Sequence, residues 1–150
     1  MKINVVIPSF YPAVVYGGPI FSSLYLSQEL SKNHDAVVHV STTNTNLKTK
    51  LDVLKNSKIE MNERFFVTYY DEIIIGKLSL RLLFYLFQDI SKSDIVHIQS
   101  IFSIPTPVAL LYAKILGKPV LLTSRGQLGV WCLKNGNRFK KLWLKLLIKP

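Results

Sequence analysis

Short runs of apolar, mostly β-branched residues recur along the chain, separated by polar turns or by segments with helical spacing. A continuous apolar run is typical of a strand that is buried on both faces, as in a parallel sheet covered by helices. The pattern predicts five strands, at residues 3–9, 36–43, 64–70, 94–100 and 119–124. Such strands need helices against both faces of their sheet, and the remaining segments supply the candidates.

Four segments carry helical signals, at residues 19–33, 78–91, 106–117 and 137–149. Residues 78–91 are apolar on nearly every side, which predicts a largely buried helix. In residues 106–117 the apolar positions follow i, i+3, i+4, i+7 spacing, which predicts the side that faces the core. That side comprises Val108, Leu111, Tyr112 and Ile115.

The polar segment at residues 44–62 is rich in Lys, Asn and Thr and is predicted to be a loop, with a short helix at residues 51–55. Outside this segment, strands and helices alternate along the chain. That alternation predicts an α/β fold with an open, mostly parallel sheet and helices on both faces. Residues 1–150 contain no repeat, low-complexity tract or linker, so we expect one domain.

Composition adds a basic character to this picture. Hydrophobic residues make up 49% of the chain, enough for a sizeable core. The formal net charge of +10 favours a polyanionic partner, which could be nucleic acid, an anionic membrane or a phosphorylated small molecule. A protein with a generally basic, solvated surface and no polyanionic partner would have the same net charge. The aromatic residues fall mostly within apolar runs, so we expect no base-stacking platform and place nucleic acid last.

The single cysteine, Cys132, excludes an intrachain disulfide and a cysteine-based metal site, and it fits a reducing compartment. The N-terminal apolar stretch is short and is broken by Pro8, unlike a signal peptide. No apolar run approaches the roughly 20 residues of a membrane span. We therefore expect a cytoplasmic protein without a metal, either free or at the inner face of the membrane.

Polar or glycine-containing segments follow three of the predicted strands. Gly17 and Gly18 lie between the first strand and the first helix, where the backbone can approach a ligand and free N–H groups can bind an anion. A purely structural turn would also use two glycines here. Neither the dinucleotide-binding fingerprint nor the P-loop pattern is present.

Two other strand ends carry candidate binding residues. His97 and Gln99 point to the same side of the strand at residues 94–100, and Gln99 is the better placed to meet a ligand. His97 is equally compatible with a core histidine whose hydrogen bonds are satisfied. Arg125 and Gly126 follow the last strand, where an arginine can bind phosphate or carboxylate, unless it is a surface arginine beside a turn. Because the carboxyl ends of parallel strands share one edge, we expect these groups to line a common hollow.

The segment at residues 137–149 combines an apolar stripe with several basic side chains. A basic amphipathic helix can lie on an anionic membrane surface. The candidate contacts are Arg138, Lys141, Lys145 and Lys149. We favour the alternative in which the stripe packs on the sheet and the lysines are solvated, because the fold needs a covering helix here.

Three stretches of the chain resemble family-4 glycosyltransferases: IPSFYPAVVYGGPI, SDIVHIQSIF and GKPVLLTSRGQLGVWCLKNGNRFKKLWLKLLIKP. The last is similar to the family's Pro-led strand, Arg-Gly turn, Trp-containing segment and Lys-rich helix. The resemblance implies a Rossmann-like, N-terminal, acceptor-side domain of a GT-B enzyme. Such an enzyme transfers a sugar from a nucleotide sugar to a glycan or lipid-linked acceptor with retention of configuration, as in cell-surface polysaccharide synthesis.

The resemblance also implies roles for individual residues. Gly17 and Gly18 match the glycine loop that approaches the donor phosphates and the reacting sugar. Arg125 and the glycine after it match the segment that borders the acceptor pocket. Family members often have a second histidine two residues after the one that matches His97. Gln99 stands at that position here, and it can form hydrogen bonds but cannot shuttle a proton.

A donor-binding domain follows the acceptor-side domain in this family and is absent from the 150 residues. We therefore expect the chain alone to be inactive, with a nucleotide sugar as co-substrate, no other cofactor and a separate donor-binding domain as a candidate partner. No residue is a convincing nucleophile or general base. The alternative is a non-enzymatic, single-domain protein that binds a nucleotide or another phosphorylated ligand.

Overall fold

The computed structural model describes residues 1–33, 35–73 and 78–129, and a six-stranded sheet lies at the centre of this part of the chain. Its strands are β1 (Lys2–Ser9), β2 (Val37–Thr43), β5 (Lys58–Asn62), β6 (Phe65–Tyr70), β7 (Ile95–Gln99) and β8 (Val120–Thr123). They are arranged in the order β5-β6-β2-β1-β7-β8. All neighbouring strands pair in parallel except β5, which is antiparallel to β6 at one edge. The five predicted strands are confirmed, each within one residue of its predicted ends.

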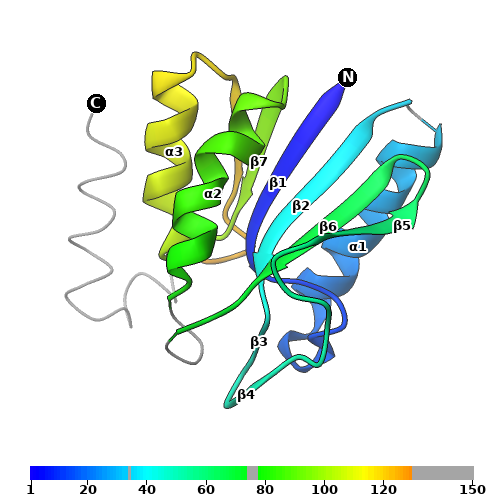
Figure 1. Cartoon of the computed structure of the whole chain (residues 1–150), viewed down its shortest axis with the longest axis vertical. Coiled ribbons are helices and arrows are strands. Elements are labelled where there is room, and N and C mark those ends of the chain that lie inside the picture. Colours follow the sequence, from blue (N-terminus) through cyan, green and yellow to red (C-terminus); the bar gives the residue numbers. More distant parts are fainter. Residues whose placement is uncertain (34, 74–77, 130–150) are drawn as a thin grey trace.

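Helices cover both faces of the sheet, as the sequence predicts (Figure 1). Helix α1 (Gly18–Asn33) packs on one face, and α2 (Leu80–Ser91) and α3 (Pro105–Ile115) pack together on the other. A 3₁₀ turn, η1 (Val14–Tyr16), precedes α1. The α/β fold with a mostly parallel sheet is therefore confirmed.

The alternation of side chains along each strand divides the core into two layers. On the α1 side, Val38 and Val67 from the central strands pack with Leu24. On the other side, Ile98 packs with Leu86 of α2 and with Ala109 of α3. Both layers are buried along β1, β2, β6 and β7, which explains why these strands are apolar over most of their length, whereas the apolar residues of β8 at the sheet edge are exposed.

The polar segment at residues 44–62 is only partly a loop, chiefly at residues 51–57, and the short helix predicted at residues 51–55 is wrong. The segment forms a small hairpin of β3 (Thr45–Asn46) and β4 (Thr49–Lys50), followed by the edge strand β5. Residue 55, within the predicted helix, forms a bridge to Tyr69 of β6. An edge strand carries charged side chains toward solvent, so its sequence lacks the apolar run of a central strand.

Helix α2 is only partly buried, contrary to the prediction of a largely buried helix. Its core-facing residues are Leu82, Leu86 and Ile90. Phe84 on the opposite side is 77% exposed. When a helix is apolar on nearly every side, its sequence does not show which side meets the sheet. Helix α2 has more apolar residues than its contact with the sheet and α3 can bury.

The predicted core-facing stripe of α3 is only half right: Val108 and Tyr112 pack against the core, but Leu111 and Ile115 do not. Ala109 and Ala113 are fully buried, whereas Leu111 and Ile115 are 55% and 64% exposed. Helix α3 packs beside α2 and above β1 and β7, and small residues allow this close approach. The fully buried surface of the helix therefore consists of small side chains, with Val108 and Tyr112 packed partly buried beside them.

The predicted basic helix, with Arg138, Lys141, Lys145 and Lys149, lies outside the described residues, as does Cys132. Within the part of the chain that the structure describes, no helix is both long enough and apolar enough to cross a membrane.

Candidate functional site

The strand order reverses next to β1, and this reversal positions the main cavity. The chain proceeds outward from β1 to β2 and β6, then returns to β7 on the opposite side of β1. In open α/β sheets such a reversal leaves a crevice at the carboxyl ends of the strands, where ligands bind. A cavity of about 740 Å³ lies there, within the range of small-molecule sites. Its walls come from the ends of β1, β2 and β7, from the loop after β8 and from the beginnings of the three helices.

Gln99 and Arg125 meet in this cavity and form a hydrogen-bonded cluster. Gln99 Oε1 accepts hydrogen bonds from Ser23 Oγ at 2.5 Å and from Arg125 Nε at 3.1 Å. Arg125 also donates from Nη1 to Ser22 Oγ at 2.7 Å and from Nη2 to Ser23 Oγ at 2.9 Å. The guanidinium is thus held between β7 and the first turns of α1, in a fixed orientation.

This cluster carries positive charge and hydrogen-bond donors without an acidic partner. Among the described residues Arg125 forms no ion pair with a carboxylate. Partial burial lowers the pKa of Arg125, yet a guanidinium stays charged at neutral pH. Gln99 is only 1% exposed and lines the cavity, and its Nε2 has no hydrogen-bond partner in the described structure. The arrangement is suited to an anionic group or to a ligand with several acceptor oxygens.

The backbone around the cluster is strained. Ser100 and Arg125 have φ values of 80° and 51°, in the left-handed region that residues other than glycine seldom adopt. Such conformations cost on the order of 1 kcal/mol each and persist only where surrounding contacts enforce them. Gln127 supplies some of these contacts, since its Oε1 accepts from Ile101 N at 2.8 Å and Phe102 N at 3.2 Å. It ties the loop after β7 to the loop after β8.

The glycine pair flanks the cavity without lining it. Gly17 has φ 69°, which explains the glycine at this turn, and Gly18 is the first residue of α1. No atom lies within 4 Å of the position that a Cβ would take at either residue. The residues on either side of the pair, Tyr16 and Pro19, do line the cavity. Gly126 has φ 77° and likewise lies between two lining residues.

His97 lies below the cavity and does not line it. The ring is buried, and its Nε2 is 2.8 Å from Thr123 Oγ1. Burial, assisted by the nearby Arg125 charge, lowers the pKa of His97 to about 4, so the ring is neutral at physiological pH. Of the two interpretations from sequence, the core histidine with a satisfied hydrogen bond describes this geometry.

Sequence reasoning missed the acidic end of the cavity. Glu72 follows β6 and is buried, and its Oε1 accepts a hydrogen bond from Thr43 Oγ1 at 3.1 Å. Thr43 ends β2, and its Oγ1 is also 2.8 Å from the Pro8 carbonyl oxygen, so its single proton is shared between the two acceptors. The sequence did contain a signal for Glu72, namely a charged residue shortly after a predicted strand. Arg125 was identified by the same feature after the last strand. The cavity therefore has a cationic end at Arg125 and an acidic end at Glu72, with apolar side chains between them.

The fold and this site define an α/β protein with a small-molecule cavity at the carboxyl ends of its parallel strands. Within residues 1–33, 35–73 and 78–129, no group of His, Cys, Asp and Glu side chains has the arrangement of a metal site. No protein-family model, curated protein or solved structure matches the chain.

Proposed function

We propose that the chain is the Rossmann-like, acceptor-side domain of a retaining glycosyltransferase with a GT-B fold. The observation that carries the proposal is the cluster of Arg125 and Gln99 at the reversal of strand order, where α/β sheets bind their ligands. An arginine without a carboxylate partner suits the phosphates of a nucleotide sugar or of a phosphate-linked acceptor. This is also the part of the chain in which the family resemblance is strongest.

The two ends of the cavity suit different parts of the substrates. Arg125 and the Gln99 amide provide donors for phosphate or sugar oxygens. At the other end, Thr43 and Glu72 provide a hydroxyl and a carboxylate, the groups that proteins use to orient sugar hydroxyls. The proposal assigns binding and orientation to these residues. It assigns no proton transfer to position 99, because an amide does not exchange protons at neutral pH.

The test is binding of nucleotide sugars by wild-type protein and by Arg125→Gln. We expect UDP-glucose, GDP-mannose or UDP-N-acetylglucosamine to raise the free energy of unfolding in a saturable manner, by about 1.4 kcal/mol at ten times the dissociation constant. The substitution should remove this stabilisation at the same ligand concentration. Arg64→Gln is the matched control, because Arg64 pairs with the exposed Asp35. Absence of saturable binding across the panel, both by the chain alone and by its mixture with a candidate donor-binding domain, would contradict the proposal.

A non-enzymatic binder of phosphorylated ligands is the second candidate. It is favoured by the scarcity of acid–base groups, since Glu72 is the one carboxylate and no histidine, lysine or cysteine is present among the described lining residues. A turnover assay separates the two candidates. Sugar transfer by the chain mixed with a candidate donor-binding domain would support the transferase, whereas saturable binding without transfer would support the binder. Robust transfer by these 150 residues alone would contradict the assignment to an acceptor-side domain.

A further inference from the structure

A second cavity, of about 470 Å³, lies beside α2 on the face of the sheet opposite α1. It occupies the space between α2 and the strands β2, β5 and β6, which no described helix covers on this side (Figure 1). No residue lines both this cavity and the one at the strand ends. The proposed transferase function makes no use of it.

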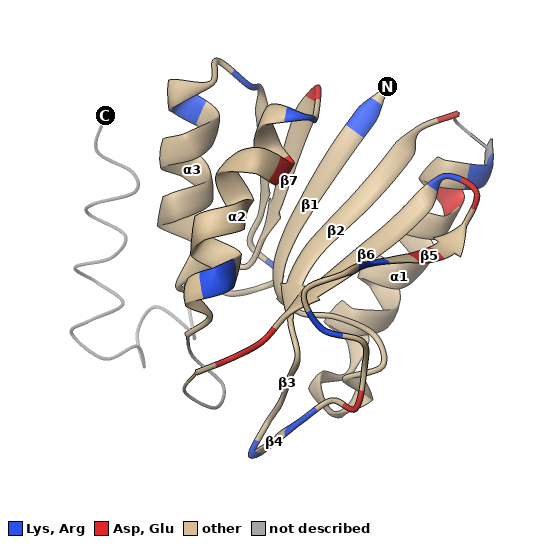
Figure 2. Ribbon diagram, viewed as in Figure 1, with Lys and Arg blue, Asp and Glu red and all other residues tan. Residues whose placement is uncertain are grey.

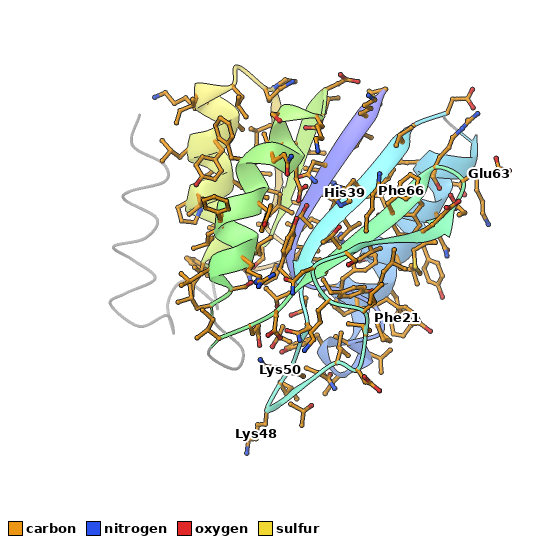
Figure 3. The ribbon with its side chains drawn as sticks, viewed as in Figure 1. Phe21, His39, Lys48, Lys50, Glu63 and Phe66 are labelled. Atoms are coloured by element: carbon orange, nitrogen blue, oxygen red, sulfur yellow. The ribbon has the colours of Figure 1, made fainter. Side chains whose placement is uncertain are left out.

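The floor of the second cavity is polar, although a sheet face beside a helix is ordinarily apolar. Strand β2 directs valines toward α1 and directs His39 and Ser41 toward α2, and Figure 3 shows His39 on the open part of the sheet. His39 Nε2 is 2.8 Å from Thr68 Oγ1 on β6. Asn4 Nδ2 on β1 donates to Ser41 Oγ at 2.9 Å. Asn4 Oδ1 is buried and has no partner in the described structure.

Asp89 of α2 faces this floor, and its side chain is only 12% exposed. Its Oδ2 accepts hydrogen bonds from Ser41 Oγ at 2.7 Å and from Tyr70 OH at 2.6 Å. Its Oδ1 lies 3.9 Å from His39 Nδ1, beyond hydrogen-bond distance. A mostly buried carboxylate is costly unless its lone pairs are used. Oδ1 is therefore available to accept a hydrogen bond from a ligand in the cavity.

The rim of the cavity is strongly basic. Lys2, Lys58, Arg81 and Lys92 are exposed around the opening. Figure 2 shows these basic positions at both ends of α2 and at the beginnings of β1 and β5. They surround the single carboxylate of Asp89 among the lining residues. Charges of one sign around a polar cavity attract a ligand of the opposite sign.

We propose that this second cavity binds a small phosphorylated polyol, such as a sugar phosphate. The phosphate lies among the basic side chains of the rim, and the hydroxyl groups donate to Asp89 Oδ1 and to the polar floor. The volume is within the range of small-molecule sites. The proposal is independent of the transferase assignment, because it uses different residues on a different part of the sheet.

The test is a titration of ¹⁵N-labelled full-length chain followed by NMR. The probes are glucose 6-phosphate, fructose 6-phosphate and glycerol 3-phosphate, with glucose and inorganic phosphate as separate additions. We expect at least one phosphorylated polyol to shift the amide signals of His39, Ser41 and Asp89 in a saturable manner, and more tightly than either glucose or phosphate. Failure of all three probes, or equal binding of inorganic phosphate, would overturn the proposal.

Substitutions separate specific recognition from general attraction of anions. The double variant R81Q/K92Q changes only exposed side chains, so it should fold, and we expect about tenfold weaker binding of the phosphorylated polyol. Lys32→Gln, on α1 at the other face, is the matched control and should leave binding unchanged. Asp89→Asn should weaken binding of the polyol phosphate and leave inorganic phosphate unaffected. Equal weakening by Lys32→Gln and the double variant would overturn the proposal.

Discussion

Arg125 is the residue on which the charge of the main cavity depends. Its guanidinium is held by Gln99, Ser22 and Ser23, all neutral, and its backbone adopts a conformation that few residues other than glycine accept. A side chain held in this way has lost its rotamer freedom before a ligand arrives, which lowers the entropic cost of binding. Conformational cost and orientation both point to a binding role for this position.

His97 gives the protein a pH dependence that can be measured. Its pKa is lowered to about 4 in the folded state by burial and then by Arg125, against an ordinary value near 6.5. The unfolded chain therefore binds more protons between these two values, and the free energy of unfolding falls as pH decreases through that window. The loss attributable to His97 is about 3 kcal/mol and is complete below pH 4.

The measurement is urea unfolding of wild-type protein and His97→Gln between pH 7 and pH 4. Glutamine keeps a hydrogen-bonding group for Thr123 and does not titrate. We expect a flatter pH dependence for the variant. Because burial also lowers the pKa of the other described histidine, His39, part of the dependence will remain. Identical pH profiles for the two proteins would show that His97 does not contribute.

At the scale of elements, α3 shows how packing can rotate the buried side of a helix away from the predicted one. Of the four large apolar residues that the pattern places on one side, Val108 and Tyr112 are partly buried, whereas the fully buried residues are Ala109 and Ala113. The exposed Leu111 and Ile115 remain on the outer side of the helix.

Substitutions in α3 distinguish the observed face from the predicted one. We expect Ala109→Leu to lower the free energy of unfolding by about 1–3 kcal/mol, because no space is left for the added carbons. Leu111→Ala should change it by less than about 0.5 kcal/mol, since the side chain is largely exposed. Chemical denaturation measures both. A larger loss for Leu111→Ala than for Ala109→Leu would favour the face predicted from sequence.

At the scale of the whole molecule, one sheet carries two polar cavities with different origins. The first arises from the reversal of strand order at the strand ends. The second arises because the connection from β2 to β6 is a hairpin and an edge strand, and no described helix covers the sheet beyond α2. The positions of both cavities follow from the order and connection of the strands. Neither position is marked by a continuous motif in the chain.

We expect the two cavities to bind their ligands independently. They share no lining residue, and the effects of changes at separate sites usually add. The double variant R81Q/K92Q should therefore alter the dissociation constant of a nucleotide sugar by less than about twofold. Isothermal titration of wild-type and variant protein provides the comparison. A larger change would show that α2 couples the two sites.

Several features could be predicted from the sequence because they depend on local composition. Parallel strands buried on both faces require continuous apolar runs, so the five strands and their α/β arrangement were evident. Gln99 and Arg125 could be placed together because the carboxyl ends of parallel strands share an edge. The edge strand β5 was missed, since one solvated side and a polar composition resemble a loop.

The sequence by itself determined the five parallel strands, the helices between them and the edge of the sheet at which Gln99 and Arg125 meet. Only the tertiary structure decided which side of α2 and α3 is buried, that Glu72 closes one end of the main cavity, and that Asn4, His39 and Asp89 meet beside α2. These outcomes depend on contacts between residues far apart in the chain. Each participant is an isolated polar or small residue in its own segment, and its role arises only when the strands are set side by side.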